Sequence, residues 1–145
     1  MSFELRARHL FWGAQAYEIM TAATSREHIT DVYYMMIVPW MHLHRRQVTG
    51  FERNGERVTI AFDGASRVEI DWEVKSYRVV LNGAEVANQD AIYCPLDEGR
   101  ICMYSTQPQR LSAVLPTGWI AVEPGRITVQ VNARQPVIVY RQKTM

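Results

Sequence analysis

Residues 57–87, RVTIAFDGASRVEIDWEVKSYRVVLNGAEVA, decide the fold of this protein. Large apolar residues alternate with small or polar ones along three successive segments, and a period of two places one set in a core and the other in water. Asp63-Gly64 and Asn82-Gly83 are turn signals, because these residue types accept the positive φ of a tight hairpin. The stretch therefore predicts an antiparallel β-meander with one buried face. The predicted buried set is Val58, Ile60, Phe62, Val68, Ile70, Trp72, Val74, Tyr77, Val79 and Leu81.

Short strands are predicted on both sides of this meander. Asn54-Gly55 is a further turn signal and predicts a hairpin that joins Val48–Arg53 to the first strand of the meander. After the meander, prolines and glycines interrupt a series of short apolar segments, a spacing that is typical of a β-sandwich or a flattened barrel. The later strands are predicted at Ala91–Cys94, Ile101–Tyr104, Leu111–Leu115, Trp119–Val122, Ile127–Val131 and Val137–Tyr140.

Two helices are predicted before the first strand. Apolar residues recur at helical spacing over residues 3–23. The second helix is expected to begin at Thr24, because Thr24 and Glu27 form a capping-box pattern. It is expected to end at Pro39, because the residue before a proline avoids helical geometry. The apolar stripes of both helices require a partner, and the sheet provides one.

The length of 145 residues indicates a single domain that can bury a core without disulfides or metal. Within it we expect a helical segment over residues 1–40 and a β-sandwich over residues 47–141. The predicted fold class is α+β, with two N-terminal helices packed on an antiparallel β-sandwich or flattened barrel.

Charge and hydropathy argue against two classes of partner. The chain has 16 basic and 15 acidic side chains, whereas a nucleic-acid-binding domain carries a basic excess gathered on one face. The longest apolar run, Val32–Met41, is too short to span a membrane. We therefore predict neither nucleic acid nor a membrane as a partner.

The cysteines and the N-terminus bear on cellular location. Cys94 and Cys102 lie in adjacent apolar segments, which favours two buried thiols over a hairpin disulfide. So few cysteines leave the redox compartment open. Residues 1–15 lack the uninterrupted apolar core of a secretory signal. A complete chain would be cytoplasmic, and a piece of a larger protein would leave the location open.

A histidine-containing segment supplies the candidate ligand-binding residues Trp40, His42, His44 and Arg45. In an extended segment, His-x-His places both imidazoles on one side, which is a metal-ligand geometry. A cupin-type barrel begins with such a pair, but the next acid here is the distant Glu52, and no histidine follows His44. We therefore favour a polar helix-to-strand junction, and predict no metal ligand, cofactor or catalytic residue.

Three carboxylates alternate along one predicted strand, at Glu69, Asp71 and Glu73. Side chains two apart on a strand point the same way at a spacing of about 7 Å, which suits acid–base chemistry on a glycosidic bond. A row of acidic side chains is also common on the solvent-exposed face of a sheet, and we favour that interpretation.

Aromatic side chains are a further candidate, since four tryptophans and seven tyrosines offer faces on which sugar rings stack. Core packing is the favoured interpretation for the tryptophans, because Trp72 is in phase with Val68 and Ile70 and two others lie in predicted helices. The four are Trp12, Trp40, Trp72 and Trp119.

Three motifs occur together in the predicted sheet: the Asn82-Gly83 hairpin, the apolar-Pro-Leu segment at Cys94–Leu96, and Ile127-Thr128-Val129 followed by Pro136-Val137-Ile138-Val139-Tyr140. With them, residues 66–105 and 115–141 resemble the β-sandwich domains that follow the catalytic barrel in multidomain glycoside hydrolases, particularly the endo-α-N-acetylgalactosaminidase-like group. In that family the acid and base lie on the barrel. The resemblance therefore implies an accessory, non-catalytic role and transfers no catalytic residue.

Three hypotheses of function follow. The favoured one is a non-catalytic module associated with carbohydrate-active enzymes, which supports a neighbouring glycosidase domain or contacts glycan. A small metal-binding or cupin-like enzyme would use His42 and His44, with Arg45 or Arg46 orienting an anionic substrate. An oligomeric interaction protein would bury the apolar residues 33–37 against a second subunit. A homo-oligomer through the helices is compatible with the favoured hypothesis.

Overall fold

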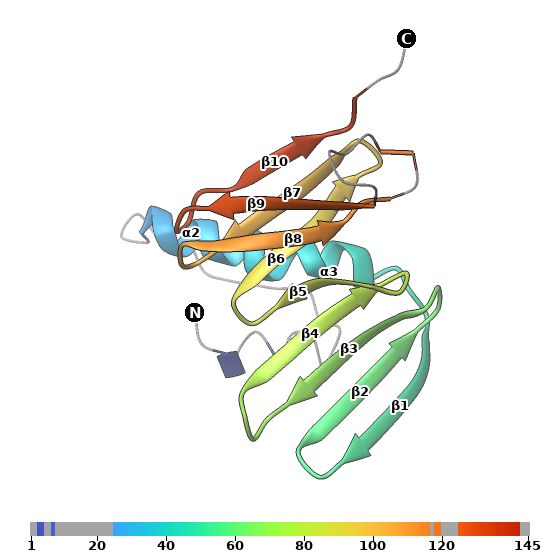
Figure 1. Ribbon diagram of the computed structural model, residues 1–145. Coiled ribbons are helices and arrows are strands. Elements are labelled where there is room, and N and C mark those ends of the chain that lie inside the picture. Colours follow the sequence, from blue (N-terminus) through green and yellow to red (C-terminus); the bar gives the residue numbers. More distant parts are fainter. Residues whose placement is uncertain (1–2, 5–6, 8–24, 117, 120–124, 143–145) are drawn as a thin grey trace.

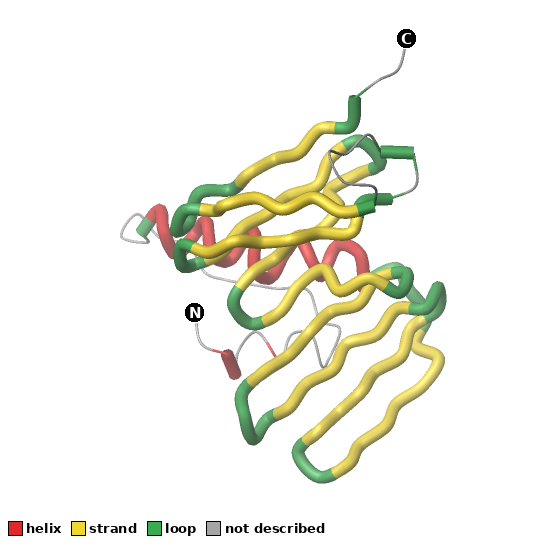
Figure 2. The backbone as a smooth tube through the Cα atoms, viewed as in Figure 1, coloured by secondary structure: helices red, strands yellow, loops and turns green. Residues whose placement is uncertain are grey.

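The protein has an α+β fold, as predicted, in which one interrupted helix lies against an open antiparallel sheet (Figure 1). The computed structural model describes residues 3–4, 7, 25–116, 118–119 and 125–142. The first predicted helix, over residues 3–23, therefore falls almost wholly outside the described residues. Figure 2 shows how strands dominate the remainder of the described chain.

The described helix runs from Arg26 to Leu43 in three parts: α2 (Arg26–Val32), a π-helical segment η1 (Tyr33–Ile37) and α3 (Val38–Leu43). Its N-cap is Ser25, whose hydroxyl accepts the His28 N–H at 3.1 Å. The predicted cap, Thr24, lies outside the described residues. No helix in the described part of the chain has both the length and the apolar character needed to cross a bilayer.

The prediction that the helix ends at Pro39 is wrong, because the helix continues through it to Leu43. A proline within a helix has no N–H to donate, and its ring crowds the carbonyl four residues before it. Here the preceding turn is widened, since the Val38 N–H donates to the Tyr33 carbonyl five residues earlier. This π-helical turn lets the chain accommodate the proline without leaving the helix.

Ten strands are formed by the described residues, and the predicted segment Trp119–Val122 lies mostly outside them. Eight strands make one antiparallel sheet in the order β1-β2-β3-β4-β5-β6-β7-β10, and β8 and β9 make a separate hairpin. The strands are β1 (Val48–Asn54), β2 (Arg57–Phe62), β3 (Ser66–Asp71), β4 (Ser76–Leu81), β5 (Ala84–Asn88), β6 (Ala91–Asp97), β7 (Arg100–Ser105), β8 (Gln109–Val114), β9 (Arg126–Val131) and β10 (Val137–Tyr140).

Strands β6 and β7 are covered on both faces, by the helix on one side and by the β8–β9 hairpin on the other (Figure 1). Alternate residues of β7 accordingly enter two separate clusters: Cys102 and Tyr104 pack on the helix side, and Ile101 and Met103 pack against the hairpin. Within the described residues, the predicted sandwich is therefore confined to this half of the sheet, and its second layer consists of β8 and β9.

The third strand is shorter than the alternation predicts. It ends at Asp71, whose carboxylate accepts the N–H groups of Glu73 and Val74 at 3.0 and 3.1 Å and so bends the chain into a turn. Val74, expected in the core, is 66% exposed. Glu73 leaves the sheet with it, so the predicted row of three acids on one strand is reduced to two.

Arg46 joins the end of the helix to two hairpin turns. Its guanidinium donates to the carbonyls of His42 and Asp63 at 3.1 and 3.2 Å, and to Asn82 Oδ1 at 3.4 Å. Gly64 has a φ of +70°, and a side chain there would place its Cβ 2.6 Å from Arg46 Nη1. Glycine is thus favoured at this turn by its backbone conformation, and a larger residue would also displace the Arg46 guanidinium.

Candidate functional site

The predicted ligand-binding residues lie at the C-terminal end of the helix. His42 belongs to α3 and His44 is its C-cap, so the extended His-x-His geometry is wrong. Residues two apart on a helix point in different directions, which separates the imidazoles. His42 Nε2 lies 2.5 Å from the Pro95 carbonyl oxygen. Because a carbonyl only accepts, this nitrogen carries the proton and ties the helix to β6.

Trp40, His44 and Arg45 do come together, but at the surface. The His44 ring stacks on Trp40 with centroids 4.3 Å apart, and Arg45 Nε donates to His44 Nε2 at 3.3 Å. His44 Nδ1 then donates to the Trp40 carbonyl oxygen at 3.3 Å. Both His44 nitrogens are engaged within the chain. Among the described residues, no group of three or more His, Cys, Asp or Glu side chains is placed to hold a metal ion.

The tryptophans do not form a common platform in the described part of the chain. Trp72 packs on the core cluster beside the helix, and Phe3 meets it edge-on at 6.1 Å. Trp119 packs on the second cluster, beneath the β8–β9 hairpin. Trp12 lies outside the described residues. The packing interpretation therefore applies to Trp72 and Trp119.

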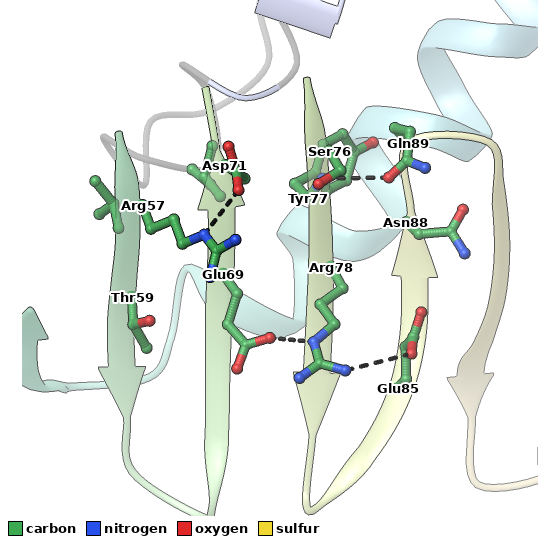
Figure 3. A pocket seen from close by; sticks show the side chains of 12 residues that line it. Arg57, Thr59, Glu69, Asp71, Ser76, Tyr77, Arg78, Glu85, Asn88 and Gln89 are labelled. Carbon is green, nitrogen blue, oxygen red and sulfur yellow. Dashed lines mark hydrogen bonds and ion pairs between the residues drawn. The ribbon is translucent and has the colours of Figure 1, made fainter. Parts of the chain in front are cut away.

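A polar groove of about 490 Å³ lies on the outward face of β2–β5, opposite the helix-side core (Figure 3). Most of its polar lining comes from the alternate positions that the meander leaves outside the core, whereas Val58, Ile70 and Tyr77, which also line it, belong to the helix-side core. Those labelled in the figure are Arg57, Thr59, Glu69, Asp71, Ser76, Tyr77, Arg78, Glu85, Asn88 and Gln89.

Glu69 is the centre of the groove's charge network. It pairs with Arg78, which lies directly opposite it on β4, and with Arg67 Nε at 2.8 Å on its own strand. The hydrogen bond from Arg78, followed by that from Arg67, lowers the pKa of Glu69 below its ordinary value. This carboxylate is therefore ionised at neutral pH and is a poor proton donor.

A second ion pair closes one end of the groove. Arg57 on β2 lies opposite Asp71 on β3, and its Nε donates to Asp71 Oδ2 at 2.9 Å. The Val74 N–H, and then Arg57, lower the pKa of Asp71. On the far side, Arg78 Nη1 lies 4.0 Å from Glu85 Oε2. Glu69 and Asp71, the two remaining acids of the predicted row, are thus both held in the ionised form. This supports the interpretation that they belong to an ordinary solvent-exposed sheet face.

Sequence reasoning did not find the arginines of this groove. The signal is nevertheless present, because Glu69 and Arg78 are equally distant from the turn that joins β3 to β4 and so face each other across the hairpin. Arg57 and Asp71 are matched in the same way across the β2–β3 hairpin. Opposite charges at mirrored positions of a predicted hairpin identify such pairs.

The pH dependence of stability should report the Glu69 ion pair. Because the folded pKa of Glu69 lies below its unfolded value, the stabilisation is complete above the unfolded pKa and is lost as the pH falls through the folded pKa. We expect the melting temperature to fall between about pH 5 and pH 3, and to fall less steeply in Glu69→Gln. The exposed Glu52 of β1, with no ion pair among the described residues, provides the control Glu52→Gln. Equal slopes for Glu69→Gln and the unmodified protein would contradict this assignment.

Cys94 and Cys102 face each other across β6 and β7 as free, fully buried thiols. Burial raises the pKa of Cys102 to about 12 and also raises that of Cys94. Since the thiolate is the reactive form, we expect neither thiol to react with a chromogenic disulfide reagent at pH 8 within about an hour in the folded protein. Both should react at once in denaturant. Rapid labelling of one thiol in the native state would contradict the burial.

No protein-family model matches the sequence, and no curated protein matches it at a significant level.

Proposed function

We propose that this chain is a non-catalytic module of a carbohydrate-active enzyme and that the groove on β2–β5 contacts glycan. The observation that carries the proposal is the convergence of hydrogen-bond donors and acceptors on one rigid sheet face. The resemblance of residues 66–105 and 115–141 to accessory domains of glycoside hydrolases supports the same class of ligand.

The groove suits the hydroxyl groups of a sugar, which both donate and accept hydrogen bonds. Arg57 donates to Asp71 through Nε, and its side chain is largely exposed, so its terminal nitrogens are open to a ligand. Guanidinium and carboxylate groups side by side match neighbouring hydroxyls in a bidentate manner. With Arg67 included, three guanidinium groups accompany the carboxylates of Glu69, Asp71 and Glu85, and this balance favours a neutral glycan.

Hydrolysis by the groove itself is disfavoured by its electrostatics. Glycoside hydrolysis needs one carboxyl group whose pKa is raised so that it can protonate the leaving oxygen. Glu69 and Asp71 both have lowered pKa values, because each is held by an arginine and a second hydrogen-bond donor. The arrangement therefore supports binding rather than bond cleavage.

The test is calorimetric titration of the chain with neutral oligosaccharides, including ligands that contain N-acetylgalactosamine. We expect binding in the millimolar to micromolar range, weakened roughly tenfold by Arg78→Met, since one charged hydrogen bond is worth about 1.5 kcal/mol or more. Arg53→Met on β1 is the matched control, because the Arg53 guanidinium lies outside the groove and, among the described residues, donates to the Gly55 carbonyl. Failure to bind any glycan, or release of sugar from one, would refute the proposal.

Exposed apolar side chains on the helix favour a second candidate function, association with another copy of the chain. Ile29, Tyr33 and Met41 are each more than 40% exposed on the helix. Burying such residues at an interface would be favourable. Light scattering should then show a dimer for the unmodified protein and a monomer for Tyr33→Ser. A monomeric unmodified protein at about 100 μM would exclude this candidate.

A further inference from the structure

A second hollow, of about 600 Å³, lies beside β10. Strand β10 forms the edge of the eight-stranded sheet that lies opposite β1 (Figure 1). The hollow combines the turn between β6 and β7, the end of β10 and the residues that follow it. The hollow is lined by Asp97, Glu98, Gly99, Arg100, Gly118, Tyr140, Arg141 and Gln142. We call it the β10 cleft.

Tyr140 is the distinguishing side chain of the β10 cleft. It is the last residue of β10 and is 69% exposed, the largest exposed fraction among the exposed large apolar and aromatic residues of the described chain. Backbone pairing with Arg100 on β7 fixes its position, although its ring remains uncovered. An uncovered aromatic face on a rigid strand is what the apolar C–H face of a pyranose ring stacks on.

The polar side of the cleft is held in place by short contacts. The Arg141 N–H donates to the Gly99 carbonyl at 2.7 Å. Arg141 also lies across Gly118, where a Cβ would come within 2.9 Å of its Nη2, so the guanidinium occupies space left by the missing side chain. On the turn, Asp97 accepts the Gly99 N–H and binds Arg100, each at 2.8 Å. The cleft therefore presents ordered donors and acceptors beside the tyrosine ring.

We infer that the β10 cleft is a glycan-binding subsite that holds one pyranose ring of a neutral oligosaccharide against Tyr140. Arg141 donates to ring hydroxyls, and the exposed carboxylate of Glu98 accepts from them. The inference rests on the proposed function for the class of ligand, but it depends on different residues from those of the groove.

The test uses the same oligosaccharides on the full chain with Tyr140→Ala and Tyr140→Phe. We expect Tyr140→Ala to weaken binding about tenfold and Tyr140→Phe to keep it within about twofold, because stacking uses the ring and not the hydroxyl. Phe51→Ala, which removes an exposed aromatic ring on β1 outside both the groove and the β10 cleft, is the matched control and should bind as the unmodified protein does. Melting curves of all variants verify that each is folded.

The outcomes separate this inference from the proposed function. If Arg78→Met weakens binding and Tyr140→Ala does not, the β10 cleft is not a binding subsite, and the proposal for the groove is retained. If Tyr140→Ala weakens binding and Arg78→Met does not, the β10 cleft is supported as a binding subsite, and the proposal that the groove contacts glycan is refuted. If the unmodified protein binds no glycan, both are overturned. Saturation-transfer NMR should also show sugar ring protons contacting an aromatic ring, with the signal lost in Tyr140→Ala and retained in Phe51→Ala.

Discussion

Replacing Asp31 with alanine is expected to lower the free energy of unfolding by about 3 kcal/mol, as measured by urea denaturation. Asp31 lies on α2 with 8% of its surface exposed, and its carboxylate accepts the hydroxyl of the fully buried Tyr104 on β7. The alanine variant leaves that hydroxyl buried without an acceptor, which costs more than the net value of the hydrogen bond. The same carboxylate pairs with Arg134 Nε at 3.2 Å, in the turn between β9 and β10.

Further variants separate the contributions of Tyr104 and Arg134 to the stability loss expected for Asp31→Ala. Asp31→Asn retains an acceptor for Tyr104 and should cost less than Asp31→Ala. Arg134→Ala should cost less than about 1 kcal/mol, because the Arg134 side chain is 39% exposed and water replaces much of its interaction. Asp31→Ala made in a Tyr104→Phe background should be milder than in the unmodified protein, since no hydroxyl is then left unsatisfied. A loss below about 0.5 kcal/mol for Asp31→Ala alone would show that the network does not hold the helix to the sheet.

Ile70→Ala should cost about 3 kcal/mol, whereas Val74→Ala should change stability by less than about 0.5 kcal/mol. Both residues belong to the same alternating series in the sequence. Ile70 is 2% exposed and packs in the helix-side core, and its truncation leaves a cavity there. Val74 lies in the turn after Asp71. Urea denaturation of the two variants, with unchanged m-values, gives the comparison directly.

This pair of variants also locates the end of β3. If the strand continued through Val74, as the alternation alone predicts, the loss of two methyl groups from a buried valine would cost well over 1 kcal/mol. Comparable losses for Val74→Ala and Ile70→Ala would therefore contradict the turn at residues 72–75.

The meander was predictable because its information is local. The turn dipeptides at residues 63–64 and 82–83 lie between strands where expected, the turn after Asn54 begins at Gly55, and all three glycines have positive φ. The alternation also identified Val58, Ile60 and Val68 as core, since a period of two needs no partner elsewhere in the chain. The α+β class follows from the same signals. Two of the groove's acids, Glu69 and Asp71, belong to the predicted row on one strand. Glu85 and the arginines were not identified from the sequence, although the arginines follow from hairpin pairing.

Contacts between segments that are far apart in the sequence account for the places where the structure differs from the prediction. The helix continues past Pro39 because the preceding π-helical turn accommodates the proline. The C-terminal end of the helix is then held to β6 by the contact between His42 and the Pro95 carbonyl, and to two hairpin turns by Arg46. Strand β10 joins β7 rather than its neighbour in sequence, and this pairing creates the cleft beside Tyr140. Turn-forming residues and the alternation of apolar residues act over only a few positions, so they can be recognised from the sequence alone. Which elements meet depends on packing energies summed over the whole domain, and these exist only once the sheet, the helix and the β8–β9 hairpin have come together.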